Sequence, residues 1–109
     1  MRAFCFSGGN RMRPTIQVNS SDPLSQCRQD IDRIDGVLVA LLRERTRLAM
    51  QAGEIKLANG EPVHAVAREA AVLQRVQELA VPPLEPEAIT RIFACIIDET
   101  RNAELRTRD

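Results

Sequence analysis

Two cations on one predicted helix face point most directly to chemistry. Arg45 and Lys56 are eleven residues apart. This spacing is close to three α-helical turns, so both side chains project from nearly the same face, about 16 Å apart along the axis. Only apolar and small residues lie between them on that face. Two cations in this arrangement are suited to the two ends of an anion-binding pocket.

Each cation also has a purely structural explanation. Arg45 interrupts an apolar seam between Leu41 and Leu48, where a cation is unfavourable unless it is paired. It can set the register of a coiled helix or extend its charge to solvent. Lys56, near the predicted end of its helix, is a favourable partner for the helix dipole. The anion-pocket interpretation therefore depends on what the other helices contribute.

Charged residues elsewhere in the chain extend the candidate site. Arg28 lies beside the same seam, but about 42 Å from Lys56 along the axis. The two side chains therefore cannot contact one small ligand from a single chain. Arg68 and Glu69 open a second predicted helix, where Glu69 has the alternative role of complementing the helix dipole.

The apolar stripe of a third predicted helix continues into polar residues. From Ile97 to Thr100 and then Glu104, steps of three and four residues keep one helix face. Glu104 either belongs to a frayed helix end or is a protonated carboxyl that lines a pocket.

These side chains require a long helix to position them. In the first segment the spacing of apolar residues alternates between three and four, which makes a heptad seam. Its members are Leu24, Cys27, Ile31, Ile34, Leu38, Leu41, Leu48, Ala52 and Ile55. Asp22 and Pro23 form a start signal, and Asn59 to Pro62 form a stop signal. The pattern predicts one helix over about residues 23–58.

Two shorter helices follow, and they complete an all-α prediction. The second spans about residues 65–80, and the third starts near Pro86 and frays over residues 106–109. The sequence has no strand pattern and no Gly-rich phosphate loop. Residues 1–21 are rich in Gly, Ser, Asn and Arg, so we expect a flexible N-terminal tail before a helical domain over residues 22–109.

The length of the first helix predicts a homodimer. A helix over residues 23–58 is roughly 50 Å long, whereas a single domain of this size has a radius of gyration of about 13 Å. Such a helix needs a long partner, and a second copy of the chain is the simplest one. In an antiparallel or crossing dimer, Arg28 of one chain can reach the region of Arg45 and Lys56 in the other.

Composition excludes several other classes of function. The net charge is zero and aromatic residues make up 3%, so we expect neither nucleic-acid binding nor attachment to a membrane surface. Cys5, Cys27 and Cys95 form no CxxC pair, and His64 is the one histidine, so we expect no metal site. Free thiols are typical of a cytoplasmic protein. Cys27 and Cys95 are expected to be small buried helix residues.

Taken in chain order, these residues resemble the all-α chorismate mutases over about residues 22–105. The pattern that carries the resemblance is Arg28, Asp35, Arg45, Lys56, Pro62-Val63, Arg68-Glu69, Thr90-Arg91-Ile92-Phe93, Ile96-Ile97, Thr100 and Glu104. The resemblance implies three-helix chains in an intertwined homodimer, with Arg28 reaching the partner's site. It implies the Claisen rearrangement of chorismate, a small dicarboxylate, to prephenate, with no metal, cofactor or covalent intermediate.

The resemblance also assigns roles to individual side chains. The substrate-binding set would be Arg28, Arg45, Lys56, Arg68, Glu69, Thr100 and Glu104. Arg28 and Arg45 would hold the substrate's carboxylates. Their physical task would be to orient the substrate, for which arginines are suited. Lys56 and Glu104 would donate to the ether oxygen, where negative charge builds up. Glu69 would hold the ring hydroxyl.

The chain departs from the family at two positions. Some members have Gln in place of Glu104, so charge at the ether oxygen becomes pH-dependent here. Many have an acidic residue where this chain has Ala65. Isochorismate pyruvate-lyases and aminodeoxychorismate mutases share the fold and remain alternatives. A non-catalytic helical dimerisation module would explain the seam, but not polar Arg45, Lys56 and Glu104 on core-facing stripes.

Overall fold

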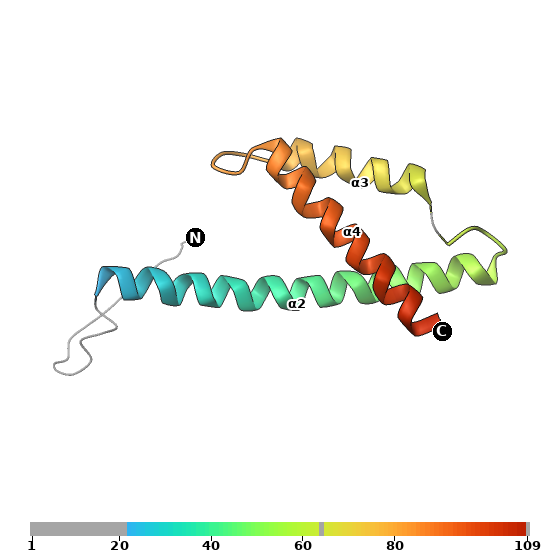
Figure 1. Cartoon of the computed structure of the whole chain (residues 1–109), viewed down its shortest axis with the longest axis horizontal. Helices are drawn as coiled ribbons and strands as arrows, with labels where there is room; N and C mark the ends of the chain where they lie inside the picture. Colours follow the sequence, from blue (N-terminus) through green and yellow to red (C-terminus); the bar gives the residue numbers. More distant parts are fainter. Residues whose placement is uncertain (1–21, 64, 109) are drawn as a thin grey trace. The chain divides into compact units, whose positions relative to one another are not determined.

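A computed structural model of the chain describes residues 22–63 and 65–108. This part of the chain contains no strand and three α-helices (Figure 1), which are α2 over Pro23–Ala58, α3 over Val66–Leu79 and α4 over Pro86–Arg108. The all-α prediction with one very long helix is confirmed. The predicted tail over residues 1–21 lies outside the described residues.

The start of α2 has a side-chain cap. The Asp22 Oδ2 atom accepts hydrogen bonds from the backbone N–H and the hydroxyl of Ser25, each 3.1 Å long. The first backbone N–H groups of a helix have no partner within it, so a carboxylate at this position stabilises the first turn. The predicted start at Asp22-Pro23 is therefore confirmed.

The end of α2 fixes the turn that carries Lys56. Gly60 has a φ of 74°, a conformation that glycine adopts without strain. The Gly60 N–H donates to the Leu57 carbonyl at 3.1 Å and the Glu61 N–H to the Lys56 carbonyl at 2.8 Å. This pair of bonds is a Schellman motif, and it satisfies carbonyl groups that the helix end would otherwise leave unpaired.

The chain divides into two compact units between Ala40 and Leu41. In the first unit the described residues are the N-terminal part of α2, whose apolar seam is exposed in the single chain. Leu24, Ile31, Ile34 and Leu38 each expose between 51% and 55% of their surface. No helix in the described part of the chain has both the length and the apolar character needed to cross a membrane.

In the second unit, α3 and α4 pack against each other. Val76 of α3 is the most buried apolar side chain among the described residues, with 5% exposed. The Gln77 side-chain amide donates to Thr90 Oγ1 at 2.8 Å, and the Thr90 hydroxyl donates to the Pro86 carbonyl at 2.8 Å. These bonds join the end of α3 to the start of α4 and so help to orient the two helices.

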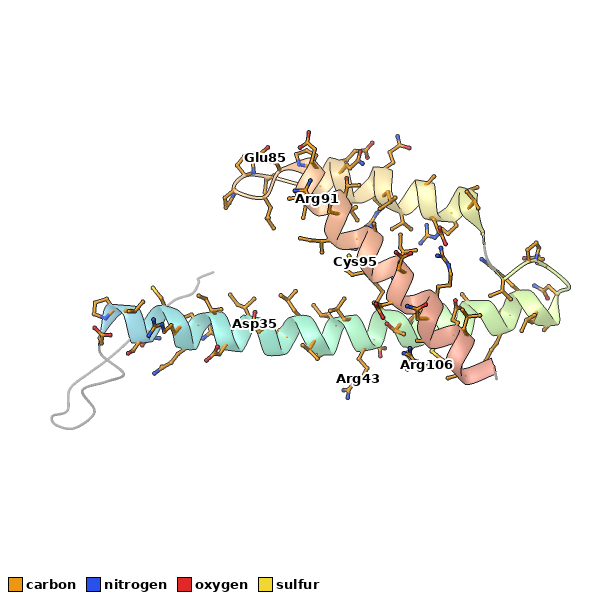
Figure 2. The ribbon with its side chains drawn as sticks, viewed as in Figure 1. Asp35, Arg43, Glu85, Arg91, Cys95 and Arg106 are labelled. Carbon is orange, nitrogen blue, oxygen red and sulfur yellow. The ribbon has the colours of Figure 1, made fainter. Side chains whose placement is uncertain are left out.

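Two expectations from the sequence differ from the single-chain structure. The third helix is expected to fray from residue 106, whereas α4 continues to Arg108. The Thr107 hydroxyl shares its hydrogen between the carbonyls of Ala103 and Glu104, at 3.2 and 3.0 Å. In the single chain Cys27 and Cys95 are exposed rather than buried, and Figure 2 shows Cys95 on α4.

Candidate functional site

A pocket in the second unit is lined by side chains of all three helices. Its volume is about 600 Å³, which is within the usual range of about 300–1,000 Å³ for small-molecule sites. Its polar lining residues are Arg45, Lys56, Arg68, Glu69, Thr100, Arg101 and Glu104. Six of the seven predicted site residues therefore lie together. The seventh, Arg28, belongs to the first unit and is not among the lining residues.

The α2 wall of the pocket contains the two cations that share a helix face. Arg45 and Lys56 both line it, with Leu48, Ala49 and Ala52 also on this wall. The side chains between the two cations on this wall are apolar, and two of them are alanines. The pocket therefore has a cation toward each end of this wall, as the eleven-residue spacing predicts.

Lys56 is oriented by the connection between α2 and α3. Its Nζ donates to the Val63 carbonyl at 3.4 Å, a long and therefore weak hydrogen bond. An ammonium has three donor hydrogens. Lys56 can therefore keep this contact and still donate to a ligand.

The lining cations include three whose charge is not offset by an ion pair. Among residues 22–63 and 65–108, Arg45, Lys56 and Arg68 form no ion pair. By contrast, Arg43 projects away from α3 and α4 (Figure 2) and does not line the pocket. Uncompensated cations around one small cavity favour an anionic ligand.

The α4 wall combines a buried hydroxyl with a carboxyl. Thr100 is only 8% exposed, and its hydroxyl donates to the Ile96 carbonyl at 2.9 Å. A hydroxyl has one hydrogen to donate, so Thr100 must leave this bond before it can donate to a ligand. Glu104 is partly buried four residues further along α4 and lines the same pocket.

Arg101 is a pocket residue that the sequence analysis missed. Its Nη2 donates to Glu69 Oε2 at 2.5 Å, and its Nη1 donates to Asp98 Oδ1 at 3.2 Å. The hydrogen bond that Arg101 donates to Glu69 raises the pKa of Arg101, and desolvation opposes this effect. A signal was available in the sequence, because Arg101 lies three residues before Glu104 and so continues the same helix face.

The described residues do not contain a group of three His, Cys, Asp or Glu side chains placed to bind a metal ion. The side chains that line the pocket instead provide hydrogen-bond donors for anionic oxygens. Ammonium and guanidinium groups orient carboxylates and stabilise developing negative charge.

Comparisons with known proteins agree with this description. A model of the family "Chorismate mutase type II" matches residues 27–105. A bifunctional chorismate mutase/prephenate dehydratase of Escherichia coli is 37% identical over 84 residues, which cover 76% of this chain and 22% of that protein. The corresponding protein of Neisseria gonorrhoeae is 39% identical over 72 residues, 66% of this chain and 19% of that protein.

A more distant match agrees with these. The bifunctional chorismate mutase/prephenate dehydratase of Aquifex aeolicus is 31% identical over 91 residues, which cover 80% of this chain and 25% of that protein. The chain thus spans about a fifth to a quarter of the length of these relatives. Because the family model covers most of the helical region that contains the pocket, the chain belongs to the chorismate mutase type II family.

Proposed function

We propose that the chain catalyses the rearrangement of chorismate to prephenate in the pocket between α2, α3 and α4. One observation carries the proposal, which is that Arg45, Lys56 and Arg68 line one small cavity without forming an ion pair among the described residues. Chorismate has two carboxylates, an enol ether and a ring hydroxyl. Its rearrangement is unimolecular and transfers no proton, so orientation and electrostatic stabilisation are sufficient.

The first task of the pocket is to fold the enolpyruvyl arm over the ring. Arg45 binds one carboxylate, and Arg28 of the partner subunit binds the other. Thr100 donates its hydroxyl to a carboxylate after leaving the Ile96 carbonyl, and Arg68 supplies further positive charge. When both ends of the substrate are held, less entropy is lost on going from the bound substrate to the transition state.

The second task is to stabilise negative charge on the ether oxygen. Lys56 donates to this oxygen from α2, and Glu104 on α4 donates to it only in its carboxylic acid form. Donors that are fixed in advance need no reorganisation when charge develops, and they therefore lower the barrier. Glu69, on α3, accepts a hydrogen bond from the ring hydroxyl.

The active unit in this proposal is a homodimer. Support comes from the seam of α2, where Ile31, Ile34 and Leu38 are each more than half exposed in the single chain. A second copy of α2 can cover this apolar surface, which is unfavourable to leave in water. The same association would bring Arg28 of one chain to the pocket of the other.

To test the proposal, the protein is incubated with chorismate. The loss of chorismate's ultraviolet absorbance and the formation of prephenate are then measured. We expect turnover that saturates with chorismate. Parallel reactions with isochorismate and with aminodeoxychorismate separate this activity from its alternatives. Pyruvate release from isochorismate would identify a pyruvate-lyase, and faster turnover of aminodeoxychorismate would identify an aminodeoxychorismate mutase. A folded protein that converts none of the three would be a dimerisation module.

A further inference from the structure

Arg101 and Glu69 form an ion pair that joins α4 to α3 inside the pocket. The bond from Arg101 Nη2 to Glu69 Oε2 is 2.5 Å long and links residues 32 positions apart in the chain. Asp98, one turn earlier on α4, holds Nη1 of the same guanidinium at 3.2 Å. The guanidinium is planar and its donors have fixed directions. Contacts on two of its nitrogens therefore fix the direction from which Arg101 approaches Glu69.

This ion pair differs from the surface pairs of the chain. Arg47 and Glu44 lie on one helix, and their side chains are 59% and 55% exposed. Arg101 and Glu69 lie on different helices, and their side chains are 37% and 29% exposed. Both also line the pocket. The Arg101–Glu69 pair is therefore placed to act on a ligand, whereas the Arg47–Glu44 pair is a solvated contact of the kind that contributes little to stability.

The oxygens of a carboxylate accept hydrogen bonds and cannot donate them. We propose that Arg101 is a positioning residue that orients Glu69 as an acceptor, so that this end of the pocket selects a substrate with a hydroxyl donor. The inference rests on the proposed function, and it identifies what determines specificity at the ring hydroxyl. A substrate without the donor leaves the partly buried Glu69 carboxylate without this hydrogen bond, and sites built to bond a substrate hydroxyl discriminate against analogues that lack it.

The test compares two substrates in four variants. The substrates are chorismate and its derivative in which the ring hydroxyl is replaced by hydrogen. The variants are Arg101→Leu, Arg101→Lys, Asp98→Asn and Arg106→Leu. Arg106 is the matched control, because it is an exposed arginine on α4 (Figure 2) and is not among the lining residues of the pocket. Helical circular dichroism and the unfolding midpoint check that each variant folds.

We expect Arg101→Leu to lower kcat/KM for chorismate about 10- to 100-fold and to change kcat/KM for the deoxy derivative less than about 3-fold. Arg101→Lys should recover part of the loss, because it keeps the charge. Asp98→Asn should have a smaller effect in the same direction, and Arg106→Leu should have none. A purely structural role would lower kcat/KM for both substrates equally.

Equal losses for both substrates in Arg101→Leu and Arg101→Lys would overturn the inference, as would unchanged kinetics in both. If Arg101→Leu does not fold, Arg101→Lys decides, because a lysine at a guanidinium site weakens the orientation of Glu69 while keeping its charge balance. In each of these cases the wild type still converts chorismate, so the proposed function stands. A wild type that does not convert chorismate would remove both the proposed function and the inference.

Discussion

Lys56 and Glu104 line one pocket from different helices, Lys56 in the last turn of α2 and Glu104 on α4. The two groups respond differently to pH. An ammonium donates hydrogen bonds, whereas a carboxyl donates only when it is protonated. If both face the ether oxygen of the substrate, the protonation of Glu104 decides whether the oxygen meets one donor and one anion, or two donors.

Glu104 should therefore make activity pH-dependent. Ionised Glu104 repels the negative charge that develops on the ether oxygen, and protonated Glu104 stabilises it. We expect kcat/KM for chorismate to rise as the pH falls from about 8 toward about 5. Glu104→Gln should keep activity and flatten the profile, because an amide donates at every pH. A flat wild-type profile together with an inactive Glu104→Gln variant would show that Glu104 acts as an anion or is structural.

Arg45 and Lys56 should be needed for activity and not for folding. We expect Arg45→Ala and Lys56→Ala each to lower kcat/KM about 30- to 1000-fold, because each loses a charge-assisted contact with the substrate. Circular dichroism should show unchanged helix content. Arg43→Ala is the matched control, since Arg43 is two residues away and projects away from α3 and α4 (Figure 2). Near-normal turnover in both pocket variants would make the cations structural.

The cap that ends α2 should be visible in stability measurements. Gly60 has a φ of 74°, so Gly60→Ala should lower the free energy of unfolding by about 1–2 kcal/mol. Gly36→Ala is a control with the opposite sign. An added Cβ there meets nothing within 4 Å, and alanine in a helix interior is about 0.5–1 kcal/mol more favourable than glycine. Urea unfolding measures both. Equal effects of the two substitutions would contradict this account of the helix end.

Local signals made most of the fold predictable from the sequence. The cap at Asp22 and the turn at Gly60 lie beside the residues that they affect, and the structure places α2 between them. The end of α4 was not predictable in this way, because residues 106–108 are helical although they contain no apolar residue and no cap signal.

The site was only partly predictable, for a different reason. Arg45 and Lys56 lie on one helix, so their spacing determines that they share a face. Arg101 meets Glu69 from another helix, 32 residues away, and no spacing rule predicts a contact between helices. The bond from Thr100 to the Ile96 carbonyl likewise depends on the rotamer of one side chain. The dimer and the position of Arg28 in it stay predictions.

The apolar seam of α2 should control association of the chain. We expect sedimentation to show a homodimer. Leu38→Glu should weaken it, because a charge at a seam position opposes burial. Val39→Glu should weaken it much less. Both side chains are more than half exposed in the single chain, but Val39 lies off the seam. A folded, active wild-type monomer would contradict the dimer.

A shared active site makes a prediction that no single-chain site makes. In the proposed dimer, each pocket contains Lys56 of one chain and Arg28 of the other. Arg28→Ala and Lys56→Ala should each be nearly inactive as homodimers, because every pocket then lacks one cation. A mixed dimer differs, since one of its pockets contains both substitutions and the other contains neither.

Mixing the two inactive variants should therefore restore activity. Random exchange makes about half of the dimers mixed, each with one intact pocket, so about a quarter of wild-type activity should return. Exchange is followed independently by placing an affinity tag on one variant and measuring how much of the other is retained with it. The control mixes Arg45→Ala with Lys56→Ala. Both residues of one chain line the same pocket, so each pocket of a mixed dimer lacks one cation and no activity should return. Proven exchange without recovery would place Arg28 outside the partner's site.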